Sequence, residues 1–284
     1  MKRLVLPILS LVFVLISCEE TPPFIDFSEP VQTKDTTYID GTVAVPQHKA
    51  VLIEDITGVR CNNCPQAAAE AVSILNKKTH DSVVVMALYA GDYLTNFTTP
   101  WKGFPVLNSN ASNQILSQLG VPTGLPNGYV DRAIFGAQTS RVNAYKVWGN
   151  LVDERLRLST PVNIGLEKSI NGRILTLKMK LEYTSSVSGS HKYALYLTES
   201  EIVSKQTTLT SYDENYVHNH VLRESIGNAV GTALTETLVP GRVFEKEVDF
   251  EIPADYDIQH CHIVCVITDS VTEEVINVRQ IDLK

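Results

Sequence analysis

Two cysteines separated by two residues, Cys61 and Cys64, form the part of the chain best suited to chemistry. A Cys-x-x-Cys pair can exchange thiols for a disulfide with a partner, form half of a zinc site, or occur by chance. In the exchange reaction one thiolate attacks a partner's disulfide and forms a mixed disulfide, which the second cysteine then displaces. The sequence on either side of the pair favours the exchange reaction.

The pair lies between a predicted buried strand at 50–56 and a predicted helix at 65–78. The strand is a short run of β-branched residues, and the helix repeats its apolar residues at three- and four-residue steps. Cys61 is therefore expected at a helix N-terminus, where free N–H groups and the helix dipole favour a thiolate. Asp55 ends the strand six residues before Cys61, and it is the candidate proton acceptor for Cys64.

Strands and helices alternate over residues 46–158, which predicts an α/β region. Its first two strands, 50–56 and 82–89, are expected to run parallel, because a helix connects them by a right-handed crossover. The remaining predicted elements are a helix at 111–119, a strand at 129–135 and a helix at 141–158.

The period changes to two residues from Ser159 onward, which predicts an antiparallel β-sandwich over 159–284. Asn171-Gly172 is typical of a tight hairpin turn. Residues 37–45 alternate enough to add an edge strand, whereas 201–241 are too irregular to assign. Strands are predicted at 162–166, 175–183, 191–199, 243–252, 261–269 and 274–283.

Cys261 and Cys265, with two neighbouring histidines, are the other candidate for a metal site. On one strand they share a face but stand about 13 Å apart at ~3.3 Å per residue. That separation prevents them from ligating one metal ion or bonding to each other without a bend. We expect them to be apolar core thiols, and we expect no metal or cofactor.

Other polar and aromatic residues allow two interpretations. His218 and His220 could contact a ligand, but a hydrogen-bonded loop packed on the sheet is favoured because no carboxylate cluster accompanies them. Aromatic residues in and before the insertion at 91–110 could line a groove beside Cys61, although simple packing of the insertion is favoured. These aromatic residues are Tyr89, Tyr93, Phe97, Trp101 and Phe104.

The N-terminus has the order of a secretory signal, with two basic residues, an apolar run at 4–17 and then Cys18. A small residue followed at once by cysteine resembles the lipobox of bacterial lipoproteins. The resemblance implies a signal peptide at 1–17, lipid attachment at Cys18 and a tether at 18–45. The alternative is a plain secreted protein that is cut near Ser17.

Composition excludes several classes of protein. The net charge is −8 and the sequence has no basic cluster, so a nucleic-acid partner is not expected. No apolar run reaches the roughly 20 residues that a membrane-spanning helix needs. Five cysteines are too few for a fold held together by disulfides, and 44% hydrophobic residues are enough for a large core.

Asp55, Cys61, Cys64 and Pro126 together resemble the thioredoxin superfamily. In that superfamily a buried aspartate stands six residues before the first cysteine, and a cis-proline packs against the disulfide. The resemblance implies a fold class of α/β plus all-β, with a thioredoxin-like domain at 46–158. It also implies that the four residues are the catalytic set.

Two details depart from that superfamily or leave a choice. Arg60 and Asn62-Asn63 replace the tryptophan and the Gly-Pro of its usual motif, and Arg60 can add positive charge beside Cys61. The dipeptide between the cysteines tunes the reduction potential. Pro122 competes with Pro126 for the cis role, and Pro126 is chosen because it immediately precedes a strand.

A second resemblance covers nearly the whole mature chain. The stretches TGVRCNNCP (57–65), GYVDR (128–132) and HNHVLR (218–223) are similar to the outer-membrane-protein-28-related lipoproteins of Gram-negative bacteria. This family implies a thioredoxin-like domain followed by a β-sandwich, held at the outer membrane by lipid and facing the periplasm or the cell surface.

The sequence therefore predicts an exported lipoprotein that exchanges disulfides with exported proteins carrying thiols or disulfides. The alternative function is a non-enzymatic surface protein whose Cys61–Cys64 disulfide is structural. In that case the sandwich at 159–284 binds a protein or a glycan.

Overall fold

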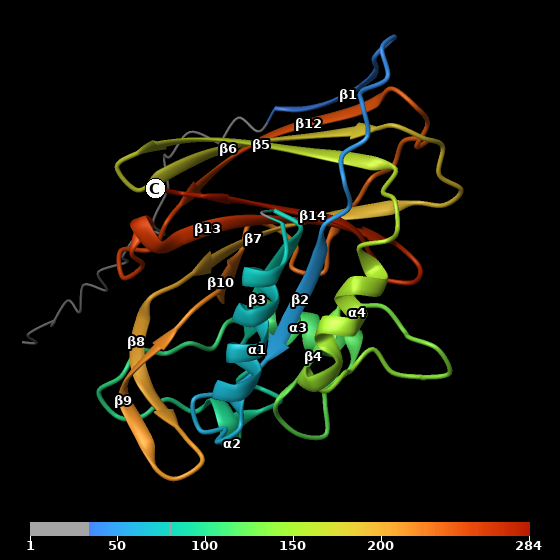
Figure 1. Cartoon of the computed structure of the whole chain (residues 1–284). Coiled ribbons are helices and arrows are strands. Elements are labelled where there is room, and N and C mark those ends of the chain that lie inside the picture. Colours follow the sequence, from blue (N-terminus) through green and yellow to red (C-terminus); the bar gives the residue numbers. More distant parts are fainter. Residues whose placement is uncertain (1–33, 80) are drawn as a thin grey trace, which may run out of the picture. The chain divides into compact units, whose positions relative to one another are not determined.

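The fold consists mainly of β-strands, which form a mixed sheet of eight strands, an antiparallel sheet of four and a two-stranded hairpin among the described residues. The computed structural model in Figure 1 describes residues 34–79 and 81–284. The strands are β1 (Asp35–Ile39), β2 (Val51–Ile56), β3 (Val83–Leu88), β4 (Asn127–Val130), β5 (Val162–Asn171), β6 (Ile174–Tyr183), β7 (His191–Glu199), β8 (Ile202–Thr207), β9 (Tyr212–His218), β10 (Val221–Ser225), β11 (Thr232–Ala233), β12 (Arg242–Glu251), β13 (Cys261–Asp269) and β14 (Val275–Asp282). The helices are α1 (Cys64–Lys77), α2 (Thr95–Thr98), α3 (Asn110–Leu119) and α4 (Trp148–Arg155), with short 3-10 helices η1 (Tyr145–Val147) and η2 (Ile258–His260).

The large sheet has the strand order β14-β13-β7-β10-β3-β2-β4, and β11 pairs with β7. Strands β2 and β3 are parallel, with Val51 opposite Val83, which confirms the predicted crossover through α1. Both strands are buried on both faces, as expected of parallel strands covered on each side, although β2 also carries Glu54 and Asp55. Strand β4 is antiparallel to β2.

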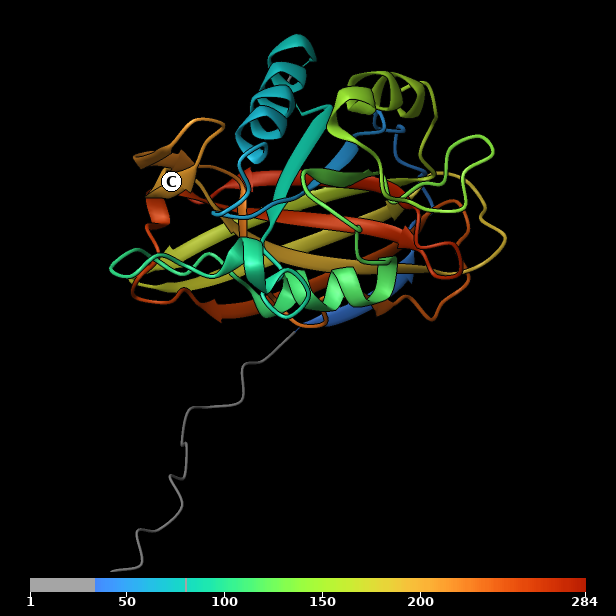
Figure 2. The same ribbon diagram turned by 90° about the horizontal axis from the view of Figure 1, so that it is seen from below.

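Alternate residues of β2 and β3 enter two different cores. Leu52 and Met86 belong to a cluster that includes α3 residues and also residues of β7, β10, β13 and β14. Val51 and Val85 face the opposite side, where they pack with residues of α1 and α4. Figure 2 shows this arrangement, with α3 on one face of the sheet and α1 and α4 on the other.

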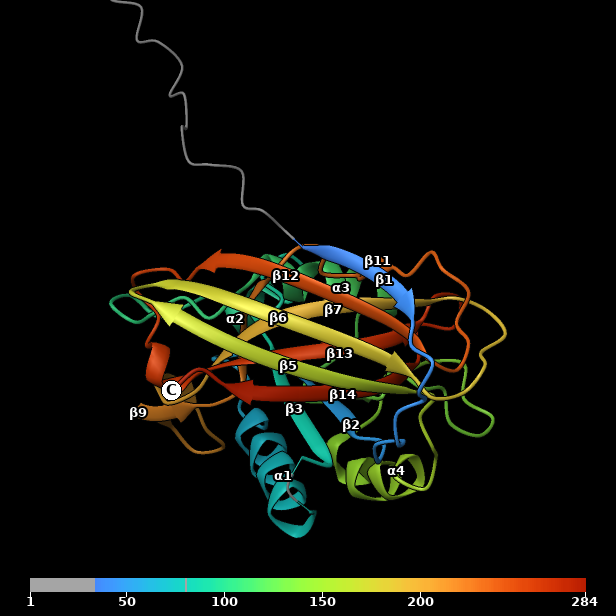
Figure 3. The same ribbon diagram turned by 90° about the horizontal axis from the view of Figure 1, so that it is seen from above.

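The four-stranded sheet, in the order β1-β12-β6-β5, packs on the β7–β13–β14 part of the large sheet (Figure 3). Leu177 and Leu181 of β6 share a core with Leu195 of β7 and Ile263 of β13. Strand β6 alternates between buried and more exposed residues, the pattern that predicted a sandwich, whereas β7 and β13 are buried along almost their whole length. The sandwich is antiparallel in its small sheet, whereas its large sheet continues into the parallel strands β3 and β2.

The regions expected on either side of residue 158 share the large sheet. Strand β10 lies parallel to β3, with Val221 opposite Ala87, and antiparallel to β7. All the described residues group into a single compact unit. The α3 core draws residues from both regions, so neither region has a separate core on that face.

A buried charge network also joins the two regions. The Asp131 carboxylate lies 2.8 Å from the Lys49 ammonium and 2.9 Å from Arg155 Nε. The Asp131 carbonyl accepts a hydrogen bond of 2.8 Å from the backbone N–H of Val275, the first residue of β14. Both charged atoms of the Lys49–Asp131 pair are almost fully buried, so they need each other as partners.

Two predicted elements are shorter in the structure. The strand expected at 129–135 ends at Val130, because Asp131 and Arg132 have φ angles of 50° and 53° and leave the extended conformation. The helix expected at 141–158 is wrong over its first turn and its last residues, since η1 and α4 together span only 145–155. Asn143 instead forms a β-bridge with Gly128, a long-range contact that overrides local helical periodicity.

The N-terminal edge strand is present but begins earlier than expected. Strand β1 spans Asp35–Ile39 and pairs with β12, whereas the sequence pattern placed it at 37–45. The expected signal peptide at 1–17, Cys18 and the first part of the tether lie outside the described residues. None of the described helices has the length and hydropathy to cross a membrane.

Candidate functional site

Cys61 and Cys64 form a disulfide, with their Cα atoms 5.4 Å apart, in the loop between β2 and α1. Helix α1 begins at Cys64, and Pro65 occupies its first turn, where a missing N–H costs no intrahelical bond. Cys61 therefore precedes the helix by three residues. The expectation that Cys61 stands at the N-terminus of α1 is wrong, and Cys64 occupies that place.

A close backbone approach shapes the loop before the disulfide. A Cβ atom on Gly58 would lie 2.5 Å from the Phe97 carbonyl oxygen, so no other residue fits without a shift. The same carbonyl accepts a 2.8 Å hydrogen bond from the Arg60 N–H, and the Gly58 carbonyl accepts one of 3.0 Å from Cys61 N–H. The insertion at 91–110 thus holds the loop from one side.

The β8–β9 hairpin holds the loop from another side. The Gln206 side-chain amide donates to the Cys61 carbonyl at 2.8 Å and to the Gly58 carbonyl at 3.2 Å. Thr207 N–H donates to the Val59 carbonyl at 2.8 Å. Both cysteines are only 2% exposed. A sulfur of a partner protein therefore reaches the disulfide only if one of these covering segments moves.

Arg60 contacts the insertion as well as preceding Cys61. Its Nε donates to the Thr99 carbonyl at 2.8 Å, and its guanidinium carbon lies 3.9 Å from the centre of the Trp101 ring. Lys205 of the hairpin approaches the same ring at 4.9 Å. Trp101 thus packs between two cations and links the insertion to the hairpin, in agreement with a packing role for this residue.

Asp55 lies near the end of β2, where it is 3% exposed, and its Oδ1 atom has no hydrogen-bond partner. Burial disfavours the charged form and raises the pKa of Asp55 to about 8. Asp55 and Cys64 line the same cavity, whose volume is about 400 Å³. The structure thus brings together two of the four residues that the sequence proposed as a set, and Cys61 joins them through the disulfide.

Tyr89 and His218 meet in the same cavity, although they lie 129 residues apart. The Tyr89 hydroxyl and His218 Nδ1 are 2.8 Å apart, and His218 Nε2 is buried without a partner. Burial lowers the pKa of His218 to about 4, so its ring is neutral near pH 7. The sequence favours packing roles for these residues over a ligand contact by His218 or a groove lined by Tyr89, and no local pattern indicates that the two would meet.

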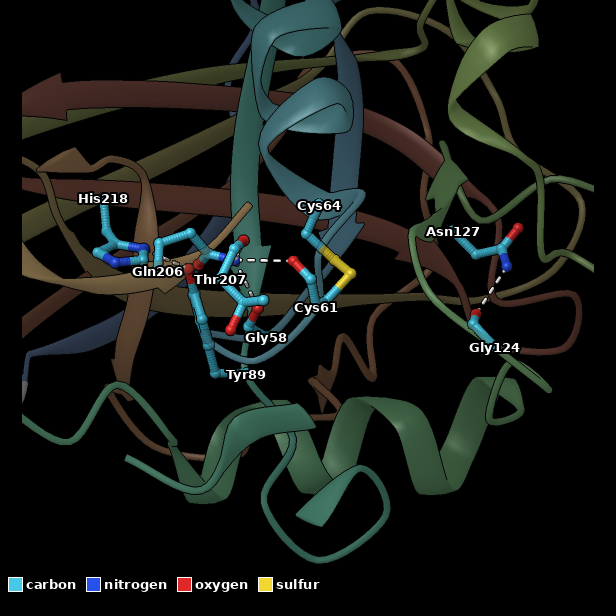
Figure 4. The surroundings of a disulfide bond; sticks show 9 residues. All are labelled: Gly58, Cys61, Cys64, Tyr89, Gly124, Asn127, Gln206, Thr207 and His218. Carbon is cyan, nitrogen blue, oxygen red and sulfur yellow. Dashed lines mark hydrogen bonds between the residues drawn. A yellow bond between two sulfur atoms is a disulfide. The ribbon is translucent and has the colours of Figure 1, made fainter. Parts of the chain in front are cut away.

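Pro126 follows a cis peptide bond, Leu125–Pro126, just before β4. This agrees with its choice over Pro122 for the cis position. The Asn127 side chain donates to the Gly124 carbonyl at 2.7 Å and closes this turn. In the view of Figure 4 the disulfide faces the side of Gly124 and Asn127, whereas Tyr89 and His218 lie on its other side.

Cys261 and Cys265 are free, buried thiols on β13. Burial raises the pKa of the Cys261 thiol to about 12 and that of Cys265 further. Cys265 Sγ lies 3.6 Å from Met179 Sδ in the sandwich core. The expectation of core thiols is confirmed, and among residues 34–79 and 81–284 no group of three acidic, histidine or cysteine residues is arranged to hold a metal ion.

Fold and site together define a β-rich protein with a disulfide-bonded Cys-x-x-Cys loop next to a largely apolar cavity. The family model of outer membrane protein Omp28 matches residues 112–284, more than half of the chain. The chain therefore belongs to the Omp28 family. The match begins within α3, so the Cys61–Cys64 loop lies outside the matched residues.

A solved structure with low sequence identity to this chain has a similar fold. HBP35 of Porphyromonas gingivalis has a TM-score of 0.65 and 14% identity, over 85% of this chain and 76% of that one. A domain of the outer membrane lipoprotein Omp28 from Porphyromonas gingivalis matches at a TM-score of 0.31 and 14% identity, over 43% of this chain and 88% of that one. No curated protein matches the chain.

Proposed function

We propose that this protein is an exported, lipid-anchored thiol–disulfide exchange protein of the outer membrane that acts on exported proteins carrying thiols or disulfides. The observation that carries the proposal is the Cys61–Cys64 disulfide lying beside Asp55, a buried carboxyl group with an unpaired oxygen atom. The strand–loop–helix order around the disulfide supports a thioredoxin-like arrangement of this region. Pro126, which follows a cis peptide bond just before β4, completes the proposed catalytic set.

In the proposed reaction the reduced protein attacks a partner's disulfide through the Cys61 thiolate. A Cys61–partner disulfide forms, and the first partner sulfur leaves as a thiolate. Asp55 accepts the proton of the Cys64 thiol, and the Cys64 thiolate then displaces the second partner sulfur. The products are the Cys61–Cys64 disulfide and a reduced partner. With a pKa of about 8, Asp55 is mostly protonated at pH 7, so only its ionised fraction, which grows as the pH rises, can accept this proton.

Reduction of insulin by dithiothreitol tests the proposal. We expect the wild-type protein to accelerate the reaction, and we expect Cys61→Ser to abolish the acceleration because the mixed disulfide can no longer form. Cys261→Ser is the matched control, since that thiol is buried in the sandwich core. Equal rates for wild type and Cys61→Ser would refute the proposal.

The burial of both cysteines favours a second candidate function. A disulfide whose two cysteines are each 2% exposed can serve only to fix the conformation of the loop. The function of the protein would then be binding of a protein or glycan by the sandwich at the cell surface. In that case Cys61→Ser lowers the unfolding temperature without changing any exchange rate. The insulin experiment therefore separates the two functions.

A further inference from the structure

The cavity beside Asp55 has the size and the walls of a small-molecule site. Its volume of about 400 Å³ lies within the ~300–1,000 Å³ typical of ligand pockets. One wall consists of small apolar side chains of α1, among them Ala68 and Ala69, and strands β2, β3, β8 and β9 contribute to the others. Alanine at these positions leaves open a space that larger side chains would fill.

Two buried polar atoms in this cavity have no hydrogen-bond partner. They are Asp55 Oδ1 and His218 Nε2, and each residue is 3% exposed. Burying a polar atom without a partner costs free energy, so such atoms commonly pair with a bound molecule. The pair belongs to segments far apart in the chain, β2 and β9, which rules out a local turn or cap as their purpose.

The electrostatics of the cavity favour an uncharged ligand. None of the described residues lining it is a lysine or arginine, so an anion would find no opposite charge. The raised pKa of Asp55 and the lowered pKa values of His218 and His220 leave all three side chains neutral at pH 7. A cation would have to ionise a desolvated carboxyl group before it gained a partner.

We infer that this cavity binds a small, uncharged molecule with an apolar body and a hydroxyl group. The apolar body packs on the alanine wall of α1, and the hydroxyl group pairs with Asp55 Oδ1 and His218 Nε2. A hydroxyl group can both donate and accept, so it satisfies a neutral carboxyl and a neutral imidazole in either tautomer. The inference requires no thiol exchange, because it concerns the protein with its disulfide intact.

Four probes of one shape test the charge and polarity of the site. They are 2-phenylethanol, ethylbenzene, 2-phenylethylamine and phenylacetate, titrated into the purified disulfide-bonded protein by calorimetry at pH 7. We expect 2-phenylethanol to bind at least about tenfold more tightly than ethylbenzene, since only the alcohol pairs the buried atoms. The charged amine and acid should bind more weakly still.

Single substitutions test whether the alcohol binds in this cavity. Ala68→Phe fills the cavity and should abolish binding of 2-phenylethanol, whereas Asn76→Phe, at an exposed position of α1 outside the cavity, should not. Asp55→Leu removes an unpaired carboxyl, so it should keep the fold and erase the preference for the alcohol over ethylbenzene. Thermal unfolding checks the fold of each variant.

Several results would overturn the inference. They are no binding of 2-phenylethanol, equal binding of ethylbenzene, tighter binding of the amine or the acid, or unchanged affinity in Ala68→Phe. Because these measurements do not involve exchange, they stand whether or not the insulin reaction supports the proposed function.

Discussion

At the scale of single residues, Asp55 makes the stability of the folded chain depend on pH. An unfolded aspartate releases its proton near 3.8, whereas the pKa of Asp55 in the folded chain is about 8. Between these values the folded state holds one proton more than the unfolded state, so stability falls as pH rises. The buried His218 acts in the opposite sense, but only below the ordinary pKa of histidine, 6.5.

Asp55→Asn should remove this pH dependence, because the amide does not titrate. Between pH 6.5 and pH 8 the unfolding free energy of the wild type should fall more steeply with pH than that of the variant. We expect the two slopes to differ by up to about 1.4 kcal/mol per pH unit. Urea unfolding at the two pH values measures the difference. Asp92→Asn, at an exposed position, is the control and should keep the wild-type slope. If the unfolding free energy of Asp55→Asn fell with pH as steeply as that of the wild type, a raised pKa for Asp55 would be contradicted.

The sequence identified only part of the site, for a physical reason. Asp55, Cys61 and Cys64 lie within ten residues, so a local pattern could relate them. Tyr89 and His218 meet only through the fold, since each looks by itself like an ordinary buried or loop residue. The position of Cys61 was misjudged because the exact start of α1 depends on the Asn62-Asn63 turn and not on apolar spacing.

At the scale of elements, the β8–β9 hairpin is attached to the loop that carries the disulfide, so we expect its opening to affect access to the two sulfur atoms. Buried Gln206 attaches it to the loop through the carbonyls of Gly58 and Cys61. Each such bond contributes roughly 0.5–1.5 kcal/mol, so losing both should ease local opening of the hairpin about tenfold.

Gln206→Ala should therefore make the disulfide react faster with a small reductant. We expect the rate of reduction by tris(2-carboxyethyl)phosphine to increase about tenfold. The two lost hydrogen bonds together are worth about 1.4 kcal/mol, which corresponds to a factor of ten. Thiol labelling and mass spectrometry follow the reaction. Asn215→Ala, on the exposed part of β9, serves as the control. An unchanged rate in Gln206→Ala would mean that the hairpin does not limit access.

The hairpin was missed because its hydrophobic pattern is inverted. Ser204 and Gln206 are buried in β8, whereas the apolar Val203 just before them is exposed. In the sandwich strands the apolar residues face the core, and the prediction of 191–199 and 261–269 agrees with β7 and β13 to the residue. Alternation identifies a strand only when its buried side is apolar.

At the scale of the whole molecule, the sequence could not show how the two regions join. Periodicity correctly distinguished the α/β pattern from the all-β pattern. It does not show which strands pair, because paired strands can lie far apart in the chain. The parallel pairing of β10 with β3 brings together Val221 and Ala87, and nothing local in either strand indicates the other. The boundary proposed at residue 158 therefore separates two patterns of sequence that share one sheet.

The proposed lipid anchor also belongs to this scale, since it determines where the folded part works. Cys18→Ala removes the thiol that would carry the lipid, so we expect the protein to leave the membrane fraction and appear in the soluble fraction. The wild type should show the added mass of acyl chains on Cys18. The Cys261→Ser variant should behave as wild type. A wild-type protein without added mass would refute the anchor.

The shared sheet has a consequence for the order of events during synthesis. Strand β14 is synthesised long after β2 and β3, yet its Val275 and Val278 complete the core that also holds Leu52 and Met86. The earlier strands therefore stay incompletely packed until β14 has been made. Cys61 and Cys64, three residues apart, face no such delay, because both partners of this disulfide belong to one short segment.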